Sequence, residues 1–316
     1  MKTLNSTLLI MLLFLSFSCD DILEEDITND NLQTKYPIEG TVVDGNTVQF
    51  SWQNLDGADD YRIQIIKSHQ VFEMDSLVST NSLTVTLDSG TYQWRVRGEN
   101  FAYETAYSFP INFSTQASTN LTDQDVILVS PSDNLYTKNI NTIFTWNKLT
   151  SVTSYNFELI KKLSGEQTVF QEAEITSNSL TINDTLFDED AEYIWKVKGL
   201  NETSETQYSQ RTIFLDRVAP NQPSLTSPAD QETTTTTVTF NWTNGTDSGN
   251  VKSGITNTIE IASDSNFNSI IHSASTPNNS AQHDFASTGT YYWRIKAIDV
   301  ATNESDYSIV RSLVAE

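Results

Sequence analysis

Few side chains in this chain of 316 residues have the types and spacing that catalysis or metal binding requires. Three histidines, His69, His272 and His283, stand in different local settings without the spacing of metal ligands. The acidic turns at residues 56–60 and 247–250 lack the spacing of a calcium loop, which closes on a glutamate. No serine-nucleophile motif, zinc-protease motif or phosphate-binding glycine loop occurs. We therefore expect no catalytic residue, no metal site and no cofactor.

Cys19 is the only cysteine, so no disulfide can form within the chain. It follows Lys2 and an apolar run at residues 8–17, which is too short to span a bilayer and predicts a signal peptide over residues 1–18. A cysteine directly after such a run is typical of a bacterial lipoprotein, in which it carries the lipid. The alternative is an ordinary signal peptide with an incidental cysteine nearby. Ser16 stands where the usual lipoprotein motif has leucine.

Residues 19–36 form an acidic segment with few apolar side chains to bury, which predicts a disordered, lipidated tether. Its acidic residues resemble the signal that sends lipoproteins to the outer face of the outer membrane in some Gram-negative bacteria; plain solvation of a linker is the alternative. The net charge of −23 excludes nucleic acid as a partner, because phosphates require lysine and arginine contacts. We expect a protein of the bacterial cell envelope that is anchored to the outer membrane by its lipid and exposed at the surface.

Two aromatic side chains, Phe101 and Tyr103, are candidates for ligand binding. They stand in the loop at residues 99–104, whereas the corresponding loops at 200–207 and 299–306 have no aromatic residue. Loops on a rigid scaffold often carry recognition. We predict that these two rings contact a ligand; the alternative is that they pack under the loop or against a neighbouring domain.

Six tryptophans occur as three pairs and define an internal repeat. The first members, each in a Phe-x-Trp motif, are Trp52, Trp146 and Trp242, and the second members, each in Tyr-x-Trp-basic-aliphatic-basic, are Trp94, Trp195 and Trp293. Equivalent tryptophans lie 94 to 101 residues apart, which indicates three copies of one domain. Because the same rings recur in every copy, we predict that they form the cores and do not serve as a platform for sugars.

Short runs of alternating apolar and polar residues predict antiparallel strands with one buried face, and no convincing helical period follows the signal segment. The copies resemble fibronectin type III domains and their bacterial Ig-like relatives in the Phe-x-Trp motif, in residues 87–96 and in residues 297–305. Thr302 stands where the bacterial modules usually have glycine. The resemblance implies a tyrosine corner, in which a hydroxyl bonds to nearby backbone, at Tyr92, Tyr193 and Tyr291.

We predict an all-β protein with three tandem fibronectin type III-like β-sandwich domains over residues 37–115, 125–216 and 224–316. The fold alone does not give the function. We expect a non-catalytic surface lipoprotein that acts as a binding or spacer module. Its partner is either a glycan, as an accessory to polysaccharide uptake, or an envelope protein, as an adhesin or scaffold. A hydrolase is less favoured, because the three repeats leave no room for a catalytic domain.

Overall fold

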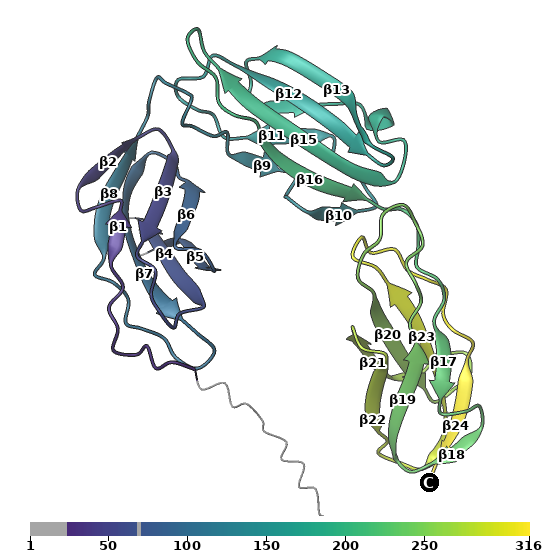
Figure 1. The fold of residues 1–316 in the computed structure, drawn as a ribbon. Helices are drawn as coiled ribbons and strands as arrows, with labels where there is room; N and C mark the ends of the chain where they lie inside the picture. The colour runs from purple at the N-terminus through teal and green to yellow at the C-terminus, as the bar shows by residue number, and fades with distance from the viewer. Residues whose placement is uncertain (1–23, 68–70) are drawn as a thin grey trace, which may run out of the picture. The chain divides into compact units, whose positions relative to one another are not determined.

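The computed structural model describes residues 24–67 and 71–316, so the predicted signal peptide, Cys19 and His69 lie outside the described residues. Apart from a single 3₁₀ turn at Asp184–Leu186, the regular structure of this part of the chain consists of β-strands. The strands form three pairs of sheets, one pair for each sequence repeat (Figure 1). No helix of the described residues is both long and apolar enough to cross a membrane.

The chain divides into two compact units. Of the described residues, the first unit contains those up to Val43 and those of Val48–Val85 and Gly90–Ser114, and so holds most of the first pair of sheets. The second unit contains Asp44–Thr47, Thr86–Ser89 and Thr115–Glu316, and so holds the second and third pairs.

The first sandwich pairs a three-stranded sheet, in the order β1-β3-β6, with a five-stranded sheet, in the order β2-β8-β7-β4-β5. Its strands are β1 (Thr34–Tyr36), β2 (Thr41–Asp44), β3 (Thr47–Trp52), β4 (Asp60–Lys67), β5 (Val71–Val78), β6 (Ser82–Thr86), β7 (Gly90–Glu99) and β8 (Ile111–Gln116). Buried and less buried residues alternate along β7, as the sequence pattern predicts for a strand with one face in the core.

The second and third sandwiches repeat this strand order, as β14-β11-β9 with β10-β16-β15-β12-β13, and as β17-β19-β22 with β18-β24-β23-β20-β21. The second contains β9 (Leu128–Ser130), β10 (Leu135–Thr137), β11 (Ile143–Trp146), β12 (Ser154–Lys162), β13 (Glu166–Ile175), β14 (Ser179–Thr181), β15 (Ala191–Leu200) and β16 (Ser209–Leu215). The third contains β17 (Ser224–Ser227), β18 (Glu232–Thr234), β19 (Thr237–Thr243), β20 (Thr256–Ala262), β21 (Ile270–Thr276), β22 (Ser280–Asp284), β23 (Gly289–Ile298) and β24 (Arg311–Ala315).

The tryptophan pairs occupy the cores, which confirms the prediction from the repeat. All six rings are buried. In each copy the phenylalanine of the Phe-x-Trp motif meets the second tryptophan edge to face, with ring centroids 5.2, 5.2 and 4.9 Å apart in the three sandwiches. Such edge-to-face pairs stabilise a core beyond the area that they bury. The repeated motif is therefore a packing unit that joins the two sheets of each sandwich.

The tyrosine corners of the second and third copies have the geometry that the resemblance implies. The Tyr193 hydroxyl donates to the backbone oxygen of Glu189 at 2.9 Å, and the Tyr291 hydroxyl donates to that of Ser287, also at 2.9 Å. Each bond closes the turn that leads into the long central strand, β15 or β23. Ala191 stands where the first and third copies have Gly90 and Gly289, and it does not prevent the corner from forming.

The expected disordered tether extends too far toward the first sandwich. Ile27 and Leu32 are buried, and β1 pairs with β3 before residue 37. The prediction for residues 27–36 was therefore wrong, because it gave more weight to the acidic composition than to two apolar side chains. The polar segment at residues 116–124, between the first two predicted domains, contains a similar exception. Leu121 is fully buried within the core of the second sandwich.

Candidate functional site

The loop with Phe101 and Tyr103 is a hydrogen-bonded turn in the first unit. The Asn100 side-chain oxygen accepts the backbone N–H groups of Ala102 and Tyr103, at 3.1 and 2.8 Å. The Asn100 backbone N–H also donates to the Tyr103 oxygen at 2.9 Å. An isolated bridge between Glu99 and Glu104 closes the base of the turn. The two aromatic residues thus stand on backbone that is already ordered.

The same turn displays its rings to solvent. Phe101 is 93% exposed and Tyr103 is 39% exposed, so neither is needed for the core of the unit that carries it. The second sandwich has Glu202 and Ser204 in the equivalent positions of its own loop. Phe109, which the sequence did not single out, is also 93% exposed a few residues further along the chain. Phenylalanine is among the residue types most often fully buried, so such exposure is its less common state.

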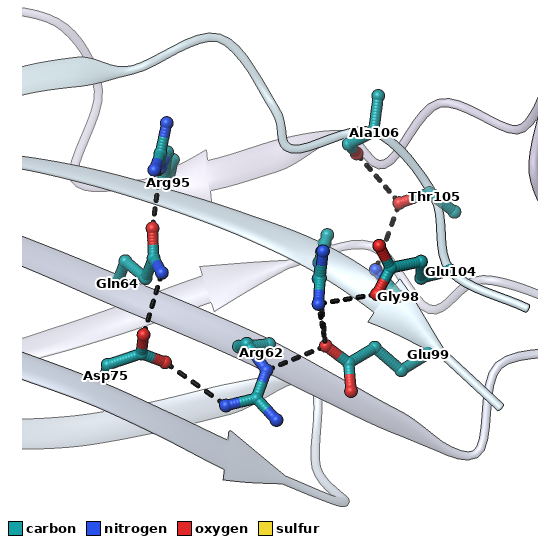
Figure 2. A network of polar contacts seen from close by, with 10 residues as sticks. Arg62, Gln64, Asp75, Arg95, Gly98, Glu99, Glu104, Thr105 and Ala106 are labelled. Carbon is teal, nitrogen blue, oxygen red and sulfur yellow. Dashed lines mark hydrogen bonds and ion pairs between the residues drawn. The ribbon is translucent and has the colours of Figure 1, made fainter. Parts of the chain in front are cut away.

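Figure 2 shows a charged network on the outer face of the five-stranded sheet of the first sandwich. Arg62 contacts Asp75 at 3.3 Å and Glu99 at 2.8 Å, and Arg97 contacts Glu99 and Glu104 at 2.7 and 2.6 Å. Burial alone would raise the pKa of Glu99, but the hydrogen bonds from Arg62 and Arg97 outweigh it and lower that pKa. Glu99 is therefore ionised at neutral pH and is no proton donor.

The network explains the basic-aliphatic-basic part of the repeated motif. In the third sandwich Arg294 binds Glu260 at 2.7 Å, and the Tyr307 hydroxyl donates to the same carboxylate at 2.9 Å. In the second, the Tyr208 hydroxyl donates to Glu158 at 2.8 Å. One basic residue of each strand, Arg97 of β7, Lys198 of β15 and Arg294 of β23, thus pairs with an acidic side chain of its own sandwich. A feature shared by all three copies supports the fold and not one specific site.

A second group of polar residues lies in the second unit, where three carboxylates converge. Asp216, Asp247 and Asp299 each place a carboxylate oxygen within 4.8 Å of an oxygen from both of the others. Asp216 directly follows β16, Asp247 lies in the loop after β19, and Asp299 directly follows β23. Among the residues that the structure describes, this is the one group of three acidic, histidine or cysteine side chains close enough to share a metal ion.

The three carboxylates are unevenly satisfied by hydrogen bonds. Asp299 accepts the backbone N–H and the side-chain amide of Asn303, each at 2.8 Å. One oxygen of Asp216 accepts the Val218 N–H at 3.1 Å, and one of Asp247 accepts the Ser253 N–H at 2.7 Å. The remaining oxygens, Oδ2 of Asp216 and Oδ1 of Asp247, are buried and have no partner within the described part of the chain.

Burial raises the pKa of Asp216 to about 6, and the nearby carboxylates of Asp247, Asp299 and Asp190 add to the rise. A hydrogen bond from the Val218 backbone opposes these effects without cancelling them. No lysine or arginine of the described residues forms an ion pair with Asp216, Asp247 or Asp299. The group therefore concentrates negative charge in a place where the protein supplies no positive charge.

The structure treats the candidate residues named from the sequence in different ways. Phe101 and Tyr103 are exposed as a ligand-binding role requires, while Cys19 lies outside the described residues. Of the acidic turns, only Asp247 joins the carboxylate group, and its partners come from segments 31 and 52 residues away in the chain. No local spacing rule could bring these three side chains together. The loop between β19 and β20, which holds Asp247, is longer than the equivalent loops between β3 and β4 and between β11 and β12, and this extra length is a partial signal in the sequence.

No family model matches this sequence, and no curated protein matches it. Among solved structures, the chain is similar to the crystal structure of chicken CNTN1 FN1-FN3 domains, with 15% sequence identity, 90% of this chain and 98% of that chain covered, and a TM-score of 0.43. The repeated sheet pairs themselves define three fibronectin type III-like β-sandwich domains in tandem. Sandwiches of this architecture occur in many cell-surface proteins, and the class suits a binding or scaffold module.

Proposed function

We propose that this chain is a non-catalytic, lipid-anchored protein of a bacterial outer membrane that binds a polysaccharide through Phe101 and Tyr103. The observation that carries the proposal is the exposure of both rings on an ordered turn, whereas the equivalent turns of the other two copies carry no aromatic residue. Aromatic faces pack against the C–H faces of sugar rings, while a phenol can donate a hydrogen bond at its rim. An ordered turn also reduces the entropy lost on binding.

The charged network beside the loop supports a non-catalytic role. A glycosidase requires one carboxylic acid with a raised pKa that protonates the leaving oxygen. The hydrogen bonds from two arginines instead lower the pKa of Glu99, and Glu104 is paired with Arg97. These carboxylates neutralise neighbouring cations and are not available as a general acid. The proposed site therefore holds a ligand without transforming it.

The binding function is tested with the purified protein on a panel of soluble polysaccharides, by affinity electrophoresis and calorimetry. We expect at least one polysaccharide to be retained, and the double variant Phe101→Ala, Tyr103→Ala to lose retention by about tenfold or more. Glu202→Ala, at the equivalent loop position of the second sandwich, is the matched control and keeps full retention. Retention of no polysaccharide by the wild type, or unchanged retention by the double variant, contradicts the proposal.

The anchor is tested separately in cells that express the chain. We expect wild-type protein to incorporate labelled palmitate and to fractionate with outer membranes, and Cys19→Ala to do neither. Digestion of intact cells with an added protease then distinguishes the two faces of the membrane, because only surface-exposed protein is cleaved. If the wild-type protein carries no lipid, the anchor part of the proposal is contradicted and the polysaccharide part is unaffected.

A further inference from the structure

The loop that carries Phe101 in the first sandwich has a structural counterpart in each of the other two. Isolated bridges join Glu99 to Glu104, Leu200 to Glu205 and Ile298 to Glu304, so the residues that follow them, Asn100, Asn201 and Asp299, occupy equivalent positions. Two copies therefore have an asparagine where the third has an aspartate. The substitution exchanges a group that donates and accepts hydrogen bonds for one that, when ionised, only accepts them.

In the first two sandwiches this asparagine ties three segments together. The Asn100 amide donates to the backbone oxygens of Glu25, at 2.9 Å, and Gly57, at 2.8 Å. The Asn201 amide donates in the same way to Thr119, at 2.8 Å, and Ser151, at 3.2 Å. In both cases one nitrogen bridges the segment that enters the sandwich and the loop before the fourth or twelfth strand, β4 or β12.

The third sandwich replaces that donor with oxygen atoms alone. Asp299 occupies the position of the amide, Asp216 belongs to the entering segment, and Asp247 belongs to the loop before β20. The Asn303 amide recovers part of the bridge by donating to the backbone oxygen of Asp216 at 2.9 Å. Nothing in the described chain donates to the free oxygens of Asp216 and Asp247. The three segments that the asparagine amide joins in the other sandwiches thus meet here at three carboxylates.

Burial makes that arrangement costly unless a cation is present. Asp216 is 0% exposed and Asp299 is 5% exposed, so water screens their repulsion poorly. An unpaired buried carboxylate is among the least favourable groups in a protein interior. A cation between the three side chains would supply the positive charge that no lysine or arginine supplies here. It would also link the entering segment to the loops of the third sandwich, as the asparagine amide nitrogen does in the other two.

We propose that a calcium ion binds between Asp216, Asp247 and Asp299 and joins the segment after β16 to two loops of the third sandwich. Calcium is bound by carboxylate and carbonyl oxygens at about 2.3–2.6 Å, so oxygens that surround one ion lie no more than about 5 Å apart. The limit of 4.8 Å among the three carboxylates meets this condition. All three ligands are hard oxygen donors, which disfavours zinc and copper.

Calcium binding is tested by titration calorimetry and thermal unfolding of the purified protein, after treatment with EDTA. We expect saturable binding of CaCl₂ with a dissociation constant of about 10⁻⁴–10⁻³ M or tighter, as in other extracellular modules. We also expect saturating calcium to raise one unfolding temperature by about 5 °C or more relative to EDTA. An absence of both effects up to about 10 mM calcium, well above that range, overturns the proposal.

Asp299→Asn is the informative variant, because it restores the residue that the first two sandwiches use. We expect it to fold, to lose the calcium response and to unfold in EDTA at a higher temperature than the wild type. Asp216→Asn should also lose the response. Asp306→Asn removes the same charge from an exposed position and is the matched control, which keeps the full response. A calcium response that survives in Asp299→Asn, or an equal response of the wild type to MgCl₂, overturns the assignment.

Discussion

At the scale of single residues, the six buried tryptophans differ in what their indole N–H groups meet. Trp94 donates to the backbone oxygen of Pro37 at 3.1 Å, whereas the indole nitrogen of its equivalent, Trp195, has no partner among the described residues. Both rings are fully buried and meet a phenylalanine edge to face. The two positions therefore separate the contribution of the ring from that of its hydrogen bond.

We predict that Trp94→Phe costs its sandwich about 1–2 kcal/mol more than Trp195→Phe costs the second one. Both substitutions remove similar volume, but only the first breaks a hydrogen bond and leaves a buried oxygen unpaired. Hydrogen exchange of the β7 and β15 amides, followed by mass spectrometry, gives the opening free energy of each sandwich separately. Equal losses, or a larger loss at Trp195, would contradict the argument.

The tyrosine corner is a second residue-scale feature with a measurable value. Tyr193→Phe keeps the ring against Phe187, at a centroid distance of 4.8 Å, and removes only the hydrogen bond to Glu189. We expect the second sandwich to lose about 1 kcal/mol of unfolding free energy in urea denaturation. Tyr136→Phe is the control, because that ring stacks on Phe214 and its loss of a hydroxyl should change stability by less than about 0.5 kcal/mol.

Many of the features of single residues could be predicted from the sequence, for a physical reason. The paired tryptophans and corner tyrosines recur because each sandwich must build the same core, and recurrence is visible without coordinates. Asp216 was missed because its partners are brought to it by folding. Ile27 was missed because a single buried side chain in an acidic stretch produces no periodic pattern.

At the scale of elements, the segment between the second and third sandwiches is fastened to the long loop after β19. The Asn221 backbone N–H donates to the Thr246 oxygen at 2.9 Å, and its side-chain amide donates to the Thr246 hydroxyl, also at 2.9 Å. Gly245 permits this approach, because a Cβ atom there would stand 1.8 Å from the backbone oxygen of Asn221. The extra residues of this loop therefore form the contact surface that binds the segment at Asn221.

Gly245→Ala tests this element directly. We expect the added methyl group to push the segment away, to destabilise the third sandwich by about 1–3 kcal/mol, and to weaken calcium binding, because Asp216 and Asp247 lie on the two sides of the contact. Gly254→Ala is the matched control, since a Cβ atom there meets nothing within 4 Å. Calorimetric titration and thermal unfolding of both variants give the comparison. Equal behaviour of the two alanine variants would show that the contact is dispensable.

Two strands of the third sandwich bring together histidines that the sequence places in unrelated settings. His272 on β21 and His283 on β22 have ring centroids 4.5 Å apart, and His283 also packs edge to face on Phe285. Burial lowers the pKa of His283, the neighbouring His272 lowers it further, and Asp284 opposes both. The neutral imidazole is therefore favoured in the folded state.

This arrangement predicts a pH dependence of stability. Because the pKa is lower in the folded protein than the ordinary value of 6.5, the unfolded chain binds the proton more readily, and stability falls as the pH drops below about 6.5. We expect the unfolding temperature of the wild type to fall more between pH 7 and pH 5 than that of His283→Gln. Identical pH profiles for the two proteins would show that the histidine pair has no influence on stability.

Element order was predictable from alternating patterns, but the joints between elements were not. The three long central strands, β7, β15 and β23, follow directly from the Tyr-x-Trp motif. The contact with Asn221 depends on Gly245, and the need for glycine there is visible only once the backbone of Asn221 is placed beside it. Loops thus hold most of what separates one copy from another, both in the exposed rings of the first sandwich and in the carboxylates of the third.

At the scale of the whole molecule, each sandwich has its own core, and the calcium proposal concerns only the last of them. The second core contains Trp146 and Trp195, and the third contains Trp242 and Trp293, without a shared residue. A cation at Asp216, Asp247 and Asp299 should therefore stabilise the third sandwich and leave the first unaffected. Modules with separate cores unfold in separate transitions when the contacts between them are weak.

We predict that calorimetry in EDTA resolves more than one unfolding transition and that calcium raises only the one that includes the third sandwich. Phe240→Leu and Phe50→Leu, at equivalent buried positions, assign the transitions, because each should lower the stability of its own sandwich by about 1–2 kcal/mol. Phe240→Leu should lower the calcium-sensitive transition, and Phe50→Leu a calcium-insensitive one. A calcium-induced rise of the transition that Phe50→Leu lowers would mean that the ion stabilises the chain as a whole, in conflict with a site confined to the third sandwich and the segment that enters it.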